Sequence, residues 1–225
     1  MCGRFALFAS PELVAEYFAL ADVPFGSLAP RYNLTPGQDI AAVRLDRNGA
    51  RRIHALRWGL VPFWAKDVTI GHRLINARLD SLATKPAFRE ALGRRRCLIP
   101  ASGFYEWGVD SAGKKQPFFV RALADPLLAL AGLWERWRAP NGESLETCVI
   151  VTTDAAPALA PIHDRMPVML TRAGQDLWLD PASAVATIAE LATHGPEVEA
   201  WPVGGAVNDP RNDDERLIAP KPAHG

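Results

Sequence analysis

Residues 97–107, CLIPASGFYEW, decide how the rest of the chain is interpreted. Apolar and aromatic residues dominate this stretch, which predicts a β-strand. Further strand-like stretches follow at 117–122, 127–134, 147–153 and 198–203. Many short strands, few helices and scattered prolines are typical of antiparallel sheets. The sequence therefore predicts an α+β fold, a single domain with a mainly antiparallel β-sheet or barrel-like core and a few flanking helices.

The first hundred residues predict two helices and two paired strands. Ser10-Pro11-Glu12 is typical of a helix start and predicts a helix of roughly ten residues. Strands at 40–45 and 52–58 flank the turn signal Asn48-Gly49. Residues 85–96 predict a short basic helix, whereas RYNLTP at 31–36 predicts a loop.

The C-terminal part of the chain predicts one more helix and a tail. Asp180-Pro181 indicates the start of a helix that ends at Gly195. Residues 219–225 contain two prolines and are expected to form a loose tail, which leaves residues 1–218 as the domain.

The composition is that of a globular protein with a sizeable core, since 48% of the 225 residues are hydrophobic and 22% are charged. The net charge is zero, but residues 1–100 carry 15 basic against 8 acidic side chains, and residues 101–225 carry 10 against 17. That asymmetry predicts a basic face. The longest apolar run, 127–134, is shorter than the ~20 residues of a membrane span, and no signal peptide is visible. We expect a cytoplasmic protein without a membrane partner.

Several common functional motifs are absent. The three cysteines form no CxxC pair, and the five histidines do not pair at metal-ligand spacing. There is no Walker loop, GxGxxG, HExxH or GxSxG motif. We therefore expect neither a metal nor a cofactor, and a reducing compartment suits the free thiols.

Cys2 directly follows the start methionine. Small residues at this position allow Met1 to be removed, which would leave Cys2 with a free α-amine and a free thiol. Such a 1,2-aminothiol can form a Schiff base with an aldehyde and then close a five-membered thiazolidine ring. Cysteine is also often a buried structural residue, and its position alone favours that reading.

Three other places combine polar residues with unusual neighbours. Glu106 lies among aromatic residues, where burial would make it a proton donor or acceptor near neutral pH, although a solvent-facing strand position is equally consistent with the pattern. Asn76 and Arg78 are two residues apart and share a face on an extended segment. His163 belongs to a His-Asp-Arg triplet bracketed by prolines, which suits proton transfer beside an anion but also a surface ion pair.

Six stretches together resemble the SRAP (SOS-response-associated peptidase) family. They are MCGRF (1–5), RYNLTP (31–36), RWGLVP (57–62), INAR (75–78), RCLIPASGFYEW (96–107) and APIHDRMP (160–167), with weaker matches at 207–208 and 217–218. Two positions depart from the family pattern. Asp80 replaces a common Glu, and Asp209 stands where a second Asn is usual.

The resemblance implies a protein that senses abasic sites in single-stranded DNA, is joined to them covalently and shields them. It implies a lyase-like, self-reacting activity, with a peptidase or self-processing activity as the weaker label. We expect Cys2 to supply both nucleophiles, Glu106 to move the proton of the amine, His163 to open the sugar ring and Asn76 to align the reacting groups. We expect a monomer, associated with the nucleoid when bound to DNA.

The predicted DNA contacts have different chemistry. Arg4, Arg78 and Arg165 are expected to bind phosphates, and Pro36 and Trp64 to wedge or stack against bases beside the lesion. Trp58 is expected to pack in the core. Asn33 and Thr152 complete the predicted DNA-binding set.

Two other functions are compatible with the same residues. In an N-terminal-nucleophile amidohydrolase or peptidase, the α-amine of Cys2 would serve as the base for its own thiol. In a noncovalent reader of modified DNA, Cys2 would be structural. The basic first half of the chain and the three arginines favour a polyanionic substrate over an amide.

Overall fold

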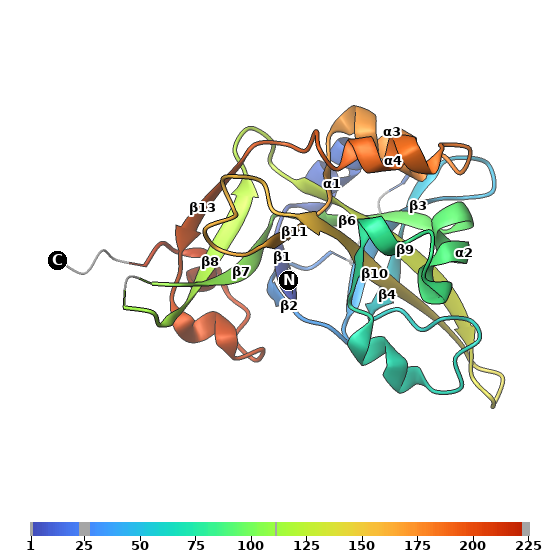
Figure 1. The fold of residues 1–225 in the computed structure, drawn as a ribbon, viewed down its shortest axis with the longest axis horizontal. Helices are drawn as coiled ribbons and strands as arrows, with labels where there is room; N and C mark the ends of the chain where they lie inside the picture. The colour runs from blue at the N-terminus through green and yellow to red at the C-terminus, as the bar shows by residue number, and fades with distance from the viewer. Residues whose placement is uncertain (1, 23–27, 111, 222–225) are drawn as a thin grey trace.

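A computed structural model describes residues 2–22, 28–110 and 112–221. It contains two sheets, and the N-terminal strand belongs to the five-stranded one (Figure 1). The five-stranded sheet has the order β13-β8-β7-β1-β2. Its strands are β1 (Arg4–Leu7), β2 (Arg31–Leu34), β7 (Gly103–Val109), β8 (Lys115–Ala122) and β13 (Val198–Pro202).

The larger sheet closes into a barrel, because β9 pairs with both β6 and β10 while β10, β4, β3 and β6 follow one another. Pairing is mostly antiparallel, which confirms the predicted class, although β10 runs parallel to β4 and β5. The strands are β3 (Asp39–Leu45), β4 (Arg51–Trp58), β5 (Asn76–Arg78), β6 (Arg96–Ala101), β9 (Leu128–Arg138), β10 (Ser144–Asp154), β11 (Arg165–Pro167) and β12 (Met169–Leu170).

The α-helices lie outside the barrel (Figure 1) and are α1 (Pro11–Phe18), α2 (Pro86–Arg94), α3 (Arg172–Leu179) and α4 (Val185–Leu191). Short 3-10 helices are η1 (Val68–Arg73), η2 (Leu79–Ser81), η3 (Gly205–Asn208) and η4 (Glu215–Ile218). The predicted start of α1 is confirmed, since the Ser10 side chain accepts from the amide of Leu13. None of the helices in the described ranges has the length and apolar character that crossing a membrane requires.

The prediction of a single strand at 97–107 is wrong, because the strand is interrupted at Ser102 and the chain passes there from one sheet to the other. β6 pairs with β9 in the barrel, whereas β7 pairs with β1 and β8. Ser102 joins the two sheets, since its amide donates to Ala6 O at 2.7 Å and its Oγ accepts from the amide of Phe8 at 3.0 Å. Gly103 is required here, because a Cβ would lie 2.3 Å from the Phe119 ring.

The loop predicted at 31–36 is also wrong in its first four residues, which form the edge strand β2. The amides of Tyr32 and Asn33 donate to Oδ1 of Asp213, at 2.5 and 2.9 Å. A carboxylate 180 residues away thus satisfies donors of an edge strand. The local pattern of Asn and Pro could not reveal that partner.

The helix predicted from Asp180 is wrong at its start. Asp180 is the C-terminal cap of α3. Its carboxylate accepts from the amide of Ala182, and this bond closes a turn. The next helix, α4, begins only at Val185. The buried Arg96 donates to Trp178 O and Asp180 O and so caps the end of α3. Sequence inspection missed α3 altogether.

The first residues of the predicted tail attach to the five-stranded sheet. Pro220 pairs with Val203, and the amide of Lys221 donates to Pro202 O at 2.8 Å. Residues 222–225 lie outside the described residues.

The core has two parts. A large cluster fills the barrel and extends beneath α1, α2 and α3. A small cluster under the five-stranded sheet includes Ala6, Tyr105, Phe119, Val207 and Leu217. The second cluster holds the C-terminal residues against the sheet that carries Glu106.

Candidate functional site

Cys2 lies two residues before β1 of the five-stranded sheet. The side chain is buried. Burial raises the pKa of the Cys2 thiol, and the nearby Glu106 carboxylate raises it further. The thiol is therefore protonated at neutral pH, and any reaction through its sulfur needs a proton acceptor.

Asn76 reaches Cys2 from the barrel. Its Nδ2 donates to Cys2 O at 2.8 Å. The position of Asn76 is fixed by parallel pairing of β5 with β10 and by Trp58, whose Nε1 donates to Ile75 O at 2.9 Å. Trp58 is buried, as expected for a core residue. Asn76 Oδ1 is buried and has no hydrogen-bond partner within residues 2–22, 28–110 and 112–221.

Glu106 and His163 approach each other from different elements. Glu106 lies on β7 and is only 5% exposed, which resolves the choice between a buried and a solvent-facing position. His163 lies in the loop between β10 and β11, and its Nε2 is 4.0 Å from Glu106 Oε1. Gly108 lets this loop pack on β7, because a Cβ there would lie 3.2 Å from Ile162 O.

The other ring nitrogen of His163 has a donor and an acceptor nearby. Nδ1 lies 3.0 Å from the amide of Arg165 and 2.7 Å from Oδ1 of Asp164. The amide requires a bare Nδ1 and the carboxylate requires a protonated one, so these contacts belong to different tautomers. His163 can therefore present either a proton or a lone pair at Nε2, which suits proton transfer.

Cys2, Asn76, Glu106 and His163, which we call the reactive cluster, are thus brought together from residues far apart in the chain. Asn76 contacts Cys2 directly. The Glu106 carboxylate raises the pKa of the Cys2 thiol and lies 4.0 Å from His163 Nε2. In the described part of the chain, no group of three or more His, Cys, Asp or Glu side chains could hold a metal ion.

Arg78, Thr152 and Arg165 line one pocket of about 290 Å³, which we call the basic pocket. β10 places them together, since Thr152 is opposite Arg78 on β5 and Asp154 is opposite Arg165 on β11. The Thr152 hydroxyl is buried, 3.5 Å from Ala77 O. Arg78 and Asn76 are two residues apart on β5, about 7 Å along an extended strand, so the basic pocket adjoins the reactive cluster.

Asp80 and Asp154 also line the basic pocket, and sequence reasoning gave neither of them a role. Asp80 pairs with Arg78 at 2.6 Å on the surface. This pairing lowers the pKa of Asp80 and raises that of Arg78. For Asp80, the departure from the family pattern at this position was the signal that could have pointed to a role. For Asp154, only the pairing of β10 with β11 reveals that it lies close to Arg165.

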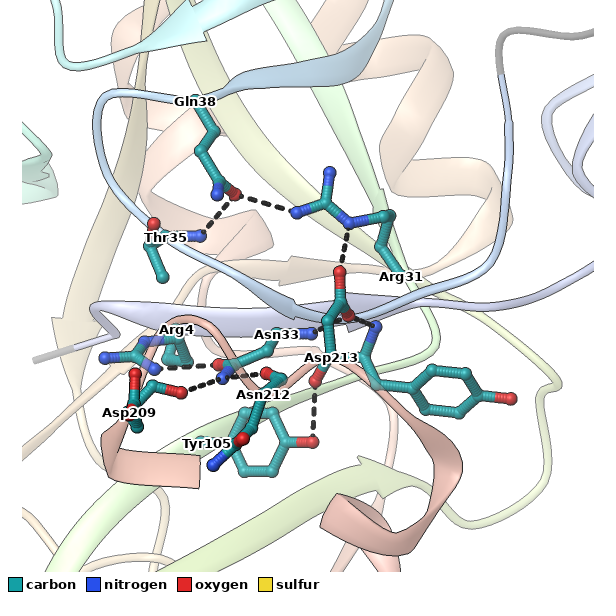
Figure 2. A network of polar contacts seen from close by, with 10 residues as sticks. Arg4, Arg31, Asn33, Thr35, Gln38, Tyr105, Asp209, Asn212 and Asp213 are labelled. Carbon is teal, nitrogen blue, oxygen red and sulfur yellow. Dashed lines mark hydrogen bonds and ion pairs between the residues drawn. The ribbon is translucent and has the colours of Figure 1, made fainter. Parts of the chain in front are cut away.

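The remaining predicted DNA contacts lie apart from the basic pocket. Trp64 is 49% exposed beside the exposed Phe63, and Pro36 is half-buried in the turn after β2. Arg4 is half-buried and its Nη1 donates to Asn33 Oδ1 (Figure 2). Asn33 itself is completely buried, so it has no surface to offer to DNA in this conformation.

Comparisons with known proteins agree over nearly the whole chain. A family model described as SOS response associated peptidase (SRAP) matches residues 1–210. The abasic site processing protein YoqW of Bacillus subtilis (strain 168) is 40% identical over 222 residues, which cover 97% of this chain and 99% of that protein. The abasic site processing protein HMCES of Mus musculus is 32% identical, and the match covers 98% of this chain and 76% of that protein.

Solved structures resemble the fold as well. A protein from Bacteroides thetaiotaomicron has a TM-score of 0.87 and 25% sequence identity, covering 98% of this chain and 100% of its own. A phage-related protein from Bordetella bronchiseptica has a TM-score of 0.70 and 30% identity, over 90% of this chain and 94% of its own.

Proposed function

The chain belongs to the SOS response associated peptidase (SRAP) family, and we propose that it recognises abasic sites in single-stranded DNA and joins them covalently to its own Cys2. The relatives named for abasic site processing support the substrate. The observation that carries the chemistry is the convergence of Asn76, Glu106 and His163 around Cys2.

The proposed reaction begins after removal of Met1 exposes the α-amine of Cys2. His163 assists opening of the deoxyribose ring to the aldehyde. The amine attacks the aldehyde carbon, and loss of water gives a Schiff base. The thiol then adds to the same carbon as the C=N double bond becomes single, its proton passes to the imine nitrogen, and a thiazolidine closes. Both nucleophiles belong to one residue, which gives the second step a high effective concentration.

Glu106 moves protons in this scheme. It accepts a proton from the ammonium group of Cys2 so that the amine becomes nucleophilic, and it returns a proton to the departing water. Its carboxylate also raises the thiol pKa, which keeps the sulfur protonated until the imine forms. The buried position of Glu106 limits exchange with bulk water. Asn76 holds the carbonyl of Cys2 and leaves Oδ1 to align the amine or the sugar.

Arg78 and Arg165 bind the phosphates on the side of the basic pocket, where the buried Thr152 of β10 lies between their strands, and Arg4 binds a phosphate on the side of the five-stranded sheet. Trp64 and Pro36 stack or wedge against neighbouring bases, each stack contributing about 1–3 kcal/mol. A missing base has no edge to read, so binding does not depend on sequence. The protein acts as a monomer.

The test is incubation with a single-stranded oligonucleotide that carries one abasic site. We expect a denaturant-stable adduct, with mass spectrometry mapping the linkage to Cys2. An oligonucleotide with a tetrahydrofuran analogue, which has no aldehyde, is the matched control and should give none. Cys2→Ser, which keeps the amine but not the thiol, should leave only an imine that hydrolyses.

A residue fused in front of Cys2 removes the free amine and should abolish the adduct. Undiminished crosslinking with that fusion, or a linkage mapped to another side chain, would refute the ring mechanism. Cleavage of an amide substrate without any DNA adduct would favour the amidohydrolase instead.

A further inference from the structure

The C-terminal strap, residues 205–218, crosses the five-stranded sheet and is fastened to β2 at Asn33 (Figure 2). Asn33 Nδ2 lies 2.7 Å from Asn212 O, 3.1 Å from Asp209 O and 3.4 Å from Val207 O. Its Oδ1 accepts from Nη1 of Arg4 at 2.8 Å. A carboxamide is suited to this place because it donates to the strap and accepts from Arg4 at the same time.

Arg4 is held entirely by neutral acceptors in the described part of the chain. Its Nη1 donates to Asn33 Oδ1 and, at 2.6 Å, to Val207 O of the strap. Burial lowers the pKa of Arg4, but a guanidinium stays charged at neutral pH. Neutral acceptors orient the group without cancelling its charge. Its Nη2 has no hydrogen-bond partner among the described residues, so it can donate to an anion.

The strap also fixes the aromatic ring beside Arg4. Asn208 Oδ1 accepts from Trp107 Nε1 at 2.8 Å, and the Arg4 guanidinium carbon lies 5.9 Å from the centre of the Trp107 ring. Trp107 directly follows Glu106 in β7. Arg4 is two residues from Cys2, about 7 Å along extended backbone, so its charge lies close to the reacting sugar.

We infer that Asn33 is a positioning residue for DNA binding, which clamps Arg4 between β2 and the strap so that its guanidinium meets one phosphate beside the lesion. Asn33 does not touch DNA. This inference rests on the proposed function, since it assigns Arg4 a phosphate next to an abasic site. It replaces the direct DNA contact that the sequence predicted for Asn33.

The test measures equilibrium binding of single-stranded DNA that carries the tetrahydrofuran analogue, as a function of salt. Each phosphate contact contributes about −0.7 to the slope of log K against log salt on single strands. Asn33→Leu removes all side-chain hydrogen bonds at similar size. We expect it to lower the magnitude of the slope by about 0.7 and to weaken binding at low salt by roughly three- to tenfold.

Gln116→Leu is the matched control. Gln116 is another buried amide of the same sheet, and it bonds Pro117 O and Val203 O without contacting Arg4. We expect this variant to lose thermal stability and to keep the wild-type salt slope. Arg4→Ala should show the reduced slope, and Arg4→Ala combined with Asn33→Leu should bind no more weakly than Arg4→Ala alone.

Asn33→Asp tests the need for a neutral acceptor. The carboxylate still accepts from Arg4, but its charge opposes that of the guanidinium and it faces three carbonyl oxygens, so we expect reduced stability and a reduced slope. If Asn33→Leu does not fold, Asn33→Ser, which cannot reach both partners, should show the same slope change.

An unchanged slope in folded Asn33→Leu or Asn33→Ser, or additive losses in the double variant, would overturn the inference. Failure of the proposed function is a separate result, namely that the wild-type protein forms no adduct with aldehyde-bearing abasic DNA.

Discussion

Asn33, which is buried, and Asn76, which is partly buried, both contact residues of the N-terminal segment, yet their amides are used differently. Asn33 uses both polar atoms, with Nδ2 on the strap and Oδ1 on Arg4. Asn76 donates to Cys2 O and keeps a buried Oδ1 without a hydrogen-bond partner among the described residues. A buried, unsatisfied acceptor costs about 1–3 kcal/mol.

This difference extends to the neighbourhoods of the two amides. In the reactive cluster, Glu106 and His163 stand 4.0 Å apart, which is longer than a hydrogen bond. Around Asn33, Asp213 accepts from two backbone amides and pairs with Arg31 (Figure 2). We conclude that Asn76 Oδ1 keeps hydrogen-bonding capacity for a substrate, whereas both polar atoms of the Asn33 side chain are satisfied within the chain.

The largest expected effect is on chemistry in the reactive cluster. Glu106→Gln removes the proton acceptor at nearly constant shape, so we expect the rate of adduct formation at saturating DNA to fall by about 100-fold. Affinity for DNA with the tetrahydrofuran analogue should stay within twofold of wild type, an order-of-magnitude expectation because no contact with phosphate is removed. Rapid-quench gel assays give the rate.

The matched control for Glu106→Gln is Glu135→Gln. Glu135 is a buried carboxylate of β9, 4% exposed, that pairs with Arg95 away from the site. Its substitution should leave the rate of adduct formation unchanged. A second readout is alkylation of Cys2. Because Glu106 raises the thiol pKa, Glu106→Gln should move the pH dependence of alkylation toward lower pH. Equal losses of rate and affinity would make Glu106 structural.

The second effect concerns stability in the network around Asn33. Asp213→Ala leaves the amides of Tyr32 and Asn33 without their acceptor and removes the pair with Arg31. We expect the free energy of unfolding to fall by about 2–4 kcal/mol, measured by urea denaturation. Adduct formation at saturating DNA should keep its wild-type rate, and a large loss there would contradict the separation of the two regions.

A smaller effect is expected in the basic pocket, where a carboxylate opposes the arginine. Asp80 pairs with Arg78 at the surface, and a phosphate must displace it. Asp80→Asn should therefore raise affinity for single-stranded DNA by about two- to fivefold, in line with the small free energy of an exposed pair. Asp214→Asn, which removes an exposed carboxylate paired with Arg216 and changes the net charge equally, is the control and should bind as wild type.

The smallest effect is a response of the strap to acid. Bonds from the side chain and amide of Arg211 lower the pKa of Asp209 to about 2, and Arg216 does the same for Asp214. A pKa below the unfolded value of about 3.9 stabilises the fold above that value, and the contribution is lost as pH falls toward 2. We expect hydrogen exchange, corrected for intrinsic rates, to increase in residues 205–218 before it does in β9.

The doubly substituted Asp209→Asn and Asp214→Asn protein should lose this difference between strap and barrel. Exchange that rises in both regions at the same pH would show that the strap unfolds only with the whole domain.

Much of the fold was predictable because its signals are local. Ser10 caps α1 by accepting from the amide of Leu13 and Pro11 occupies its first turn, and the Asn48-Gly49 turn joins β3 to β4 with Gly49 at φ +80°. The errors occurred where a distant residue decides. Residues 31–34 form a strand by pairing with β1 while Asp213 accepts from their amides, and Ser102 with Gly103 divides 96–109 between two sheets.

The residues of the reactive cluster were predicted from sequence because Cys, Asn, Glu and His in those motifs resemble one family. The mutual geometry of these residues could not be predicted from sequence. The approach of His163 to Glu106 depends on Gly108, and the position of Asn76 depends on the indole of Trp58. Asn33 shows the opposite case, in which the motif was recognised but the side chain lies inside the molecule.

The sequence by itself determined which chemical groups are present, a thiol at position 2, a carboxylate among aromatic residues and an imidazole between prolines, together with the local turns and caps. Only the tertiary structure decided which of these groups meet, which arginine is compensated by a carboxylate and which asparagine is buried. The reason is that hydrogen bonding and desolvation depend on distant partners, such as Asn33 and Val207, which are 29 and 203 residues from Arg4, and no local pattern encodes such pairs.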